Sequence, residues 1–244
     1  MDYVIALANP IQRIIQDEFL KNDNWMLYVE GLKNTLIMTV LALLLGIFLG
    51  AIIALIKNLP KSYLTMPLKW IANLYTTIIR GTPVMVQLLF TYYVIFSFAP
   101  REAKLFIAAL SFGLNSGAYI SEIFRGGIQS VSVGQMEAGR SLGLTRGQTM
   151  RFIILPQAVR NILPALFNEF IALLKETSIA KTIAIMDITN AGDSIRSRSQ
   201  SYAPLIISGL MYLILVLFLE QIQRVVERRM NGNDSSRKSR EEIR

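Results

Sequence analysis

Polar side chains within apolar stretches are the residues of this chain with the clearest potential for chemistry. Glu169 lies near the centre of one apolar stretch, and Asn115 and Ser116 lie near the centre of another, between Gly113 and Gly117. An ionisable or strongly polar group inside a bilayer is unfavourable unless it is paired or hydrated, so such residues should face protein or water. We therefore predict a polar pathway through the membrane. Its candidate residues are Glu169, Asn115, Ser116, Gln87 and Asn168.

Structural roles are the alternative for several of these charged groups. Glu169, Lys175 and Glu176 could instead form structural ion pairs near a subunit interface or the extracellular mouth. Glu122 and Arg125 lie three residues apart, a spacing that brings two side chains together on a helix. We expect these two to form an ion pair that supports the segment following them.

The composition excludes several kinds of chemistry. The chain has no cysteine and no histidine, so it lacks thiol nucleophiles, disulfides, imidazole bases and the usual zinc ligands. An intramembrane hydrolase is disfavoured for the same reason. The sequence also has no Gly-x-x-x-x-Gly-Lys-Ser/Thr loop for nucleotide phosphates, so any nucleotide must bind to a different polypeptide.

Membrane-spanning helices are the elements that would position these residues. The 244 residues are 52% hydrophobic and only 17% charged, with a mean hydropathy of +0.43, which is unusual for a soluble domain. A helix needs roughly 20 mostly apolar residues to cross the hydrocarbon layer. Five stretches are candidates: 36–56, 71–98, 105–124, 162–185 and 203–219. We therefore predict an all-α, polytopic membrane protein with five transmembrane helices.

Small residues and proline modify two of these spans. Gly46 and Gly50 lie four residues apart in the first span, a spacing that favours close packing against another helix. Pro83 removes a backbone donor from the second span, three residues after Arg80, so that span should be kinked or broken. Arg80 either lines the pathway or supports the helix end.

The distribution of basic residues predicts the orientation of the chain. With five spans, the segments on one side carry 15 Lys and Arg residues and those on the other side carry 7. Because basic residues concentrate in cytoplasmic segments, the amino terminus should lie outside and the carboxyl terminus in the cytoplasm. The net charge of +8 then reflects membrane topology, and we expect no nucleic-acid partner.

Three parts of the chain are predicted. Residues 1–30 form an extracellular segment with an amphipathic helix, residues 31–222 form the membrane domain, and residues 223–244 form a basic cytoplasmic tail that should be disordered. The amphipathic face consists of Ile11, Ile14, Ile15 and Phe19. The start of the chain is acidic and lacks a long apolar core, so we do not expect a secretory signal peptide.

The cytoplasmic segment 126–160 is too long for a simple connection between helices, which usually takes about 2–8 residues. Two capping-box patterns occur in it, Ser132 to Gln135 and Thr145 to Gln148. Gly143 can supply the left-handed residue that ends a first helix, and Pro156 should prevent a second helix from continuing far. We predict two short helices joined by a tight turn.

This segment also carries a motif that resembles the EAA loop of ABC importer permeases. The family pattern is Glu-Ala-Ala, three residues, Gly, nine residues, Ile, one residue and Leu-Pro. The chain keeps this spacing with Glu137-Ala-Gly139, Gly143 and Ile153-Ile-Leu-Pro156, and departs from it only at Gly139, where the family usually has alanine. Other stretches are similar to the polar amino acid uptake branch: Arg80-Gly-Thr-Pro83 with Gln87, Tyr119 to Arg125, Leu155-Pro-Gln-Ala158, and Asn168-Glu-Phe170 with Lys175 to Ser178.

The resemblance implies a type I ABC importer permease in a bacterial cell membrane that moves polar amino acids into the cell by alternating access. Such a chain is not itself an enzyme and holds no cofactor, since ATP and Mg²⁺ bind to partner ATPase subunits. The other implied partners are a second permease subunit, identical or different, an extracellular substrate-binding protein and membrane lipid. The implied ATPase-docking residues are Glu137, Ala138, Gly139, Arg140, Gly143, Leu155 and Pro156.

Some members of that branch have a substrate site in the permease itself. Glu169 could accept from the ammonium group of an amino acid, and Asn115 could donate to its carboxylate. Two alternatives stay open at this level. One is an ion-coupled secondary transporter that uses Glu169 and Lys175 as its coupling pair, and the other is a surface hairpin at 132–156 that binds no partner. The particular amino acid is not defined by these residues.

Overall fold

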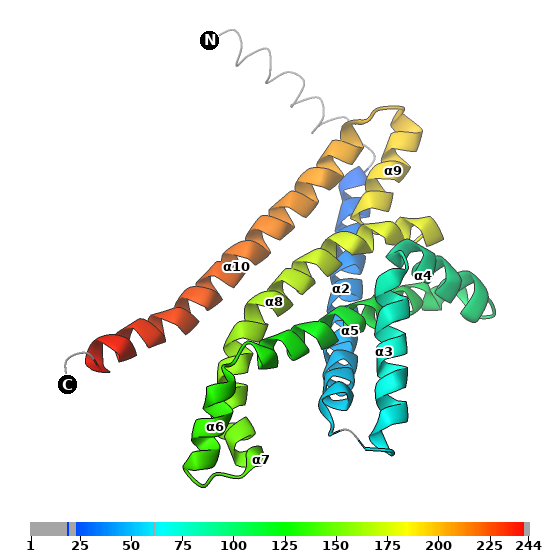
Figure 1. Ribbon diagram of the computed structural model, residues 1–244. Helices are drawn as coiled ribbons and strands as arrows, with labels where there is room; N and C mark the ends of the chain where they lie inside the picture. The colour runs from blue at the N-terminus through cyan, green and yellow to red at the C-terminus, as the bar shows by residue number, and fades with distance from the viewer. Residues whose placement is uncertain (1–18, 20–22, 61, 242–244) are drawn as a thin grey trace. The chain divides into compact units, whose positions relative to one another are not determined.

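The computed structural model describes Phe19 and residues 23–60 and 62–241, with the side chains of residues 231–241 left undescribed. In these ranges the chain forms helices joined by short turns, and contains no β-strand (Figure 1). The predicted all-α class is confirmed. The predicted amphipathic residues Ile11, Ile14 and Ile15 lie outside the described part, whereas the Phe19 ring stacks on the Tyr28 ring at 5.7 Å between centroids.

The helices follow one another with few residues between them. The α-helices are α2 (Asn24–Asn58), α3 (Thr65–Gly81), α4 (Val84–Phe90), α5 (Lys104–Gln129), α6 (Val133–Ser141), α7 (Arg146–Thr149), α8 (Leu155–Glu176), α9 (Ile188–Ser199) and α10 (Ala203–Glu241). Two π-helical turns, Thr91–Ile95 and Met150–Ile154, and two 3₁₀ turns, Arg101–Ala103 and Thr177–Ile183, extend or connect them. The helical backbone of α10 therefore covers most of the segment for which the sequence predicts a disordered tail.

Three of the described helices are long and apolar enough to cross a membrane, namely Asn24–Asn58, Arg101–Gln129 and Ala203–Met230. A fourth span results if Thr65–Gly81 and Val84–Ile95 are one bent span. The break between them falls at the predicted position, before Val84. The predicted span 162–185 lies mainly on α8 and is not among these, so the count of five remains a prediction.

The chain divides into two compact units, each built from three separate segments. The first consists of Met1–Leu43, Pro83–Gly113 and Leu173–Val216, and the second of Leu44–Thr82, Leu114–Ala172 and Leu217–Arg244. Each unit thus gathers residues that are far apart in the sequence.

The first unit has an apolar core in which Met38, Leu88, Phe112 and Leu173 are fully or almost fully buried. Asp187 is fully buried two residues after Ile185 of this core, and it caps the start of α9.

The Asp187 carboxylate accepts from the backbone N–H groups of Thr189 and Asn190, and Oδ2 also accepts from the Tyr212 hydroxyl at 3.2 Å. A Cβ on Gly31 would lie 2.6 Å from the Asp187 carbonyl oxygen, so α2 passes directly beside this helix start.

The second unit holds the close contact that the two glycines of the first span predict. A Cβ on Gly46 would come within 3.1 Å of the Ser116 side chain, and one on Gly50 within 2.7 Å of Ile120. A side chain at position 50 would collide with Ile120, and one at position 46 would be a tight fit, which confirms the predicted close packing of α2 on α5. On α5, Asn115 and Ser116 are 4% and 1% exposed, so these polar residues face protein as expected.

Candidate docking arm and polar clusters

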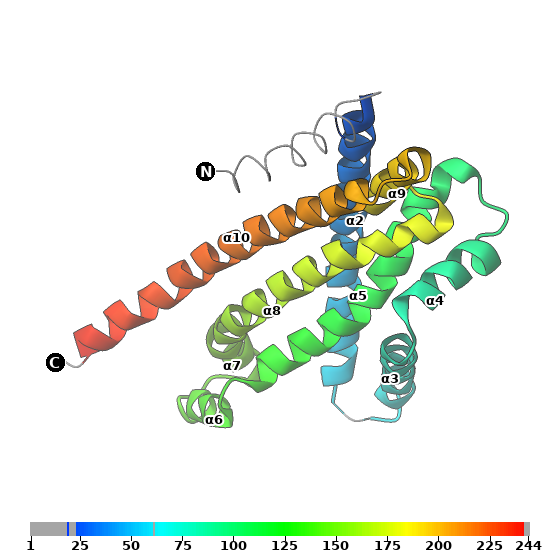
Figure 2. The same ribbon diagram turned by 90° about the horizontal axis from the view of Figure 1, so that it is seen from above.

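The arm is defined here as residues 133–154, which comprise α6, the turn at Gly143, α7 and the π-helical turn Met150–Ile154. Helices α6 and α7 pack against each other near the start of α8, as both views of the ribbon show (Figures 1 and 2). The arm lies entirely within the second unit.

The start of α6 differs from the prediction. Ser132 is the residue before the helix, but its side chain makes no capping hydrogen bond. Instead, the Ser132 carbonyl accepts from the Gln135 N–H at 3.0 Å. Because this backbone bond already satisfies the Gln135 amide, a hydroxyl is not required there, and the predicted capping box at Ser132 is wrong.

The end of α6 matches the prediction at Gly143. This residue has a φ of 83°, the left-handed conformation that glycine adopts without steric penalty. The Gly143 N–H donates to the Arg140 carbonyl at 3.0 Å, and the Leu144 N–H donates to the Gly139 carbonyl at 3.1 Å. These two bonds form a Schellman motif, which satisfies the carbonyl groups at the helix end.

The second capping box is present as predicted. The Thr145 N–H donates to Gln148 Oε1 at 2.8 Å, and the Gln148 N–H donates to Thr145 Oγ1 at 3.3 Å. With Gly143 just before it, this box determines where one helix stops and the next begins. Hydrogen bonds thus hold the turn between α6 and α7 at both of its ends.

Pro156 does not end the second helix, contrary to the prediction. The turn Met150–Ile154 is π-helical, and the Leu155 N–H donates to the Met150 carbonyl. This wider turn, directly before the proline, relieves the clash that a proline ring has with the preceding turn of a regular helix. The helical path from α7 therefore continues into α8 and joins the arm to a long helix without a flexible linker.

Six of the seven predicted docking residues have exposed positions on this framework: Glu137, Ala138, Arg140, Gly143, Leu155 and Pro156. Gly139 is buried instead. A Cβ at this position would lie 2.5 Å from Thr149 Cγ2 and 3.2 Å from Ile153 Cδ1. The absence of a side chain at Gly139 therefore allows α6 to pack closely against Thr149 and Ile153. Because this position is buried, it is not available for contact with a partner. Leu142, at the tip, is 80% exposed.

The five candidate pathway residues lie in different surroundings. The Ser116 hydroxyl donates to Glu169 Oε1 at 2.7 Å, which joins α5 to α8 and brings two of the candidate residues together. Asn168, the neighbour of Glu169, is exposed and its amide oxygen accepts from Gln223 of α10 at 3.1 Å. Gln87 belongs to the first unit, whereas the other four candidates belong to the second.

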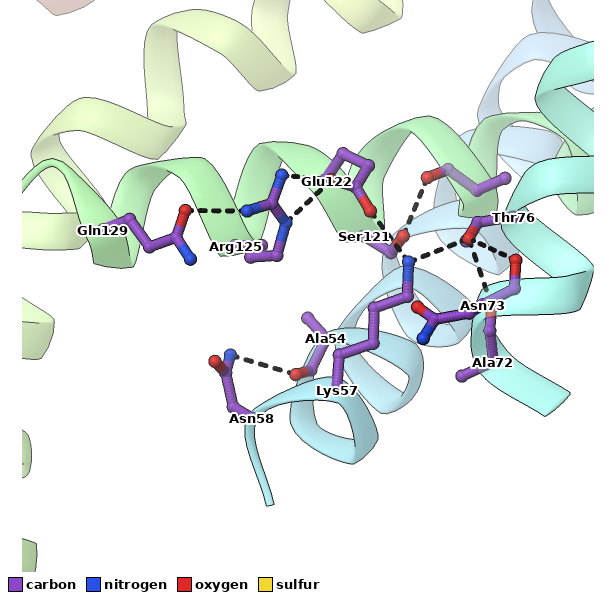
Figure 3. A network of polar contacts seen from close by, with 11 residues as sticks. Ala54, Lys57, Asn58, Ala72, Asn73, Thr76, Ser121, Glu122, Arg125 and Gln129 are labelled. Carbon is purple, nitrogen blue, oxygen red and sulfur yellow. Dashed lines mark hydrogen bonds and ion pairs between the residues drawn. The ribbon is translucent and has the colours of Figure 1, made fainter. Parts of the chain in front are cut away.

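A charged cluster joins three helices of the second unit (Figure 3). Arg125 Nη2 lies 2.6 Å from Glu122 Oε2, which confirms the predicted ion pair. Lys57 Nζ lies 2.8 Å from Glu122 Oε1 and donates to the Thr76 hydroxyl at 2.8 Å. Sequence reasoning missed Lys57, because a lysine at the end of an apolar span was interpreted only as a marker of topology.

Arg80 has a structural contact at the end of α3. Its guanidinium group lies 5.4 Å from the centre of the Tyr119 ring, in the cation–π range. This contact favours the helix-end role over the pathway role. The residues that the structure describes contain no group of three or more acidic residues that could hold a metal ion.

These elements define a membrane protein: apolar helices long enough to span a bilayer, a polar pair between α5 and α8, and a helical arm. The chain belongs to the family described as "Binding-protein-dependent transport system inner membrane component", whose pattern matches residues 42–232. Membership in this family confirms the predicted class of protein and the predicted membrane location.

Individual relatives agree with this assignment. The arginine transport system permease protein ArtQ of Bacillus subtilis strain 168 is 39% identical over 208 residues, which cover 84% of this chain and 93% of the relative. A putative glutamine transport system permease protein, GlnP of Rickettsia typhi, is 36% identical with the same coverage. A chain in the crystal structure of an amino acid ABC transporter with histidines superposes with a TM-score of 0.77 at 42% identity, covering 83% of this chain and 94% of that one. The fold is that of a type I ABC importer permease.

Proposed function

We propose that this chain forms one half of the translocation pathway of an ATP-driven importer for polar amino acids, and that its arm docks on a separate ATPase subunit. ATP and Mg²⁺ act on that subunit, and an extracellular binding protein delivers the substrate. The second half of the pathway comes from another permease subunit, identical or different. In this proposal residues 1–30 lie outside the cell, residues 31–222 form the membrane domain, and residues 223–244 lie in the cytoplasm.

The structure of the arm is the observation that supports the proposed interaction with an ATPase. Glu137, Arg140 and Leu142 are exposed along and just after α6, while Gly139 on the same helix is buried against α7. The turn at Gly143 is bonded on both sides, and the helical path runs on into α8. A rigid element with an exposed outer surface can transmit the movement of a bound partner to the membrane helices.

The substrate class is supported by two observations. The relatives have names that specify arginine and glutamine transport. In addition, the second unit has a carboxylate, Glu169, that accepts a hydrogen bond from Ser116 between α5 and α8. A carboxylate in such a position can accept from the ammonium or guanidinium group of an amino acid. The ion-coupled alternative has no support among these comparisons.

Single-cysteine cross-linking tests the docking, because the chain contains no cysteine of its own. Leu142→Cys introduces a thiol at the tip of the arm, and Tyr63→Cys introduces one at a 97% exposed position on the same predicted side of the membrane. Membranes are treated with a short bifunctional thiol–amine reagent, and captured proteins are probed with a photoreactive ATP analogue and identified by mass spectrometry.

We expect an ATP-binding protein to be captured from Leu142→Cys and not from Tyr63→Cys. Capture of no ATP-binding protein from Leu142→Cys would contradict the proposal. Transport in proteoliposomes with the ATPase and the binding protein should require ATP. Uptake by the chain alone on an ion gradient would favour the secondary transporter instead.

A further inference from the structure

The ammonium group of Lys57 is turned into the protein. Lys57 is the last residue but one of α2, and lysines near the ends of spans usually extend towards the headgroup region. Its side chain is nevertheless only 9% exposed. Withdrawing an ammonium group from water is unfavourable, so the contacts that hold it there must compensate.

These contacts join three helices at one point. Lys57 comes from α2, the Thr76 hydroxyl from α3 and the Glu122 carboxylate from α5, with both distances from the Lys57 nitrogen at 2.8 Å (Figure 3). Glu122 uses one oxygen for Lys57 and the other for Arg125. Thr76 is itself 5% exposed. The ammonium group is therefore a charged connection between α5 and both α2 and α3, in addition to their packing contacts.

The cluster continues along α5 to the base of the arm. Arg125 Nη1 donates to Gln129 Oε1 at 2.7 Å, and Gln129 is the last residue of α5. The next residue, Ser130, accepts from Asn161 of α8 at 2.8 Å. Hydrogen bonds and ion pairs thus follow α5 from Lys57 to the point at which the chain enters the arm.

Close packing also holds α5 against α8 near the base of the arm. A Cβ on Gly127 would lie 2.2 Å from Ile162 Cγ1, so α8 is in direct contact with the backbone of α5. The last turn of α5 and the first turns of α8 hold the two ends of the arm. The base of the arm is thus held by α5 and α8, and Glu122 and Lys57 form a charged link from α5 to α2 and α3.

We propose that Lys57 is a positioning residue that makes α2 and α3 move with the arm during transport. This inference rests on the proposed function, because it assigns to Lys57 the transmission of the ATPase-driven movement. Without the ammonium group, α5 and the arm keep their own contacts but lose the charged connection to α2 and α3. Nucleotide hydrolysis should then continue while less of it results in transport.

The first test uses the purified chain without partners. Lys57→Met removes the charge and keeps an unbranched stem, Lys57→Arg keeps the charge, and Lys69→Met is the matched control, since Lys69 donates to the Leu59 carbonyl in an exposed position. Hydrogen–deuterium exchange is measured for α3 and for residues 122–132. We expect Lys57→Met to raise exchange in both segments by about tenfold or more, whereas Lys57→Arg stays near the native level and Lys69→Met leaves 122–132 unchanged. Native exchange at 122–132 in Lys57→Met overturns the proposal.

The second test uses the assembled transporter in proteoliposomes. In Lys57→Met, basal ATP hydrolysis and capture of the ATPase from Leu142→Cys should be retained, and substrate moved per ATP should fall about tenfold and return with Lys57→Arg. An unchanged ratio of substrate to ATP overturns the proposal. If Lys57→Met does not accumulate in the membrane, Glu122→Gln takes its place in both tests. Failure of the native chain to bind an ATPase refutes the proposed function and the transmission role that rests on it, whereas the exchange experiment tests the connection through Lys57 without any partner.

Discussion

Gly139 and Thr149 are in such close contact that a Cβ at position 139 would lie 2.5 Å from Thr149 Cγ2 and 2.8 Å from Thr149 Oγ1. Both residues are buried, and the Thr149 hydroxyl donates to the Thr145 carbonyl at 3.0 Å. The distance between α6 and α7 in the arm is therefore determined by the absence of one methyl group. The usual alanine of the EAA pattern would not fit here beside threonine.

Gly139→Ala should destabilise the arm by about 1–3 kcal/mol, the usual range for overpacking. The local opening free energy is measured by hydrogen exchange of residues 133–149. Gly134→Ala on the same helix is the control, because its Cβ would meet only Ser132 Oγ at 3.5 Å. The double variant Gly139→Ala with Thr149→Ala should recover most of the loss, since it removes both close contacts. Equal opening free energies for Gly139→Ala and Gly134→Ala would show that the contact is not tight.

Thr145→Ala should destabilise the start of α7 by about 1 kcal/mol, because it removes the hydroxyl that accepts from the Gln148 N–H. Ser132→Ala is the matched control on α6, where the side chain makes no capping bond, and its effect should be near zero. Exchange of the Gln148 and Gln135 amides measures the two effects separately. A larger loss for Ser132→Ala than for Thr145→Ala would contradict the assignment of the caps.

Gly127→Ala should destabilise the folded chain by about 1–3 kcal/mol, because the new methyl group would lie 2.2 Å from Ile162 Cγ1. The adjacent variant Gly126→Ala meets no atom within 4 Å and should be neutral or slightly stabilising. Thermal unfolding in detergent compares the two variants, and Gly127→Ala with Ile162→Ala should regain part of the loss. Similar unfolding temperatures for both single variants would show that α5 and α8 are not in direct contact there.

Glu169→Gln tests the polar pathway. If Glu169 accepts from a cationic part of the substrate, the loss of its charge should lower transport of a basic amino acid about tenfold or more and that of a neutral one less. Ser116→Ala is the companion variant, because it removes the 2.7 Å hydrogen bond and keeps the carboxylate. Proteoliposome uptake and substrate-stimulated ATP hydrolysis provide the measurements. Unchanged transport and stimulation in Glu169→Gln would exclude Glu169 from the pathway.

Local features of the fold could be predicted because short-range geometry determines them. Gly143 needs only a left-handed residue after a helix, and Thr145 needs only a glutamine three residues later. The pair Glu122–Arg125 follows from helical spacing alone. Prediction failed where the backbone had an alternative local hydrogen bond available. The Ser132 carbonyl replaced its hydroxyl, and a π-helical turn accommodated Pro156.

The sequence by itself determined that this chain is an all-α membrane protein with an EAA-type arm, because apolar length, charge distribution and motif spacing are properties of the linear chain. Only the tertiary structure decided that Lys57 turns inward to Glu122, that Ser116 meets Glu169 and that Gly139 has no room for a methyl group. Each of these contacts joins residues from different helices. Their partners depend on which helix faces come together, and periodicity along one helix contains no information about its neighbour.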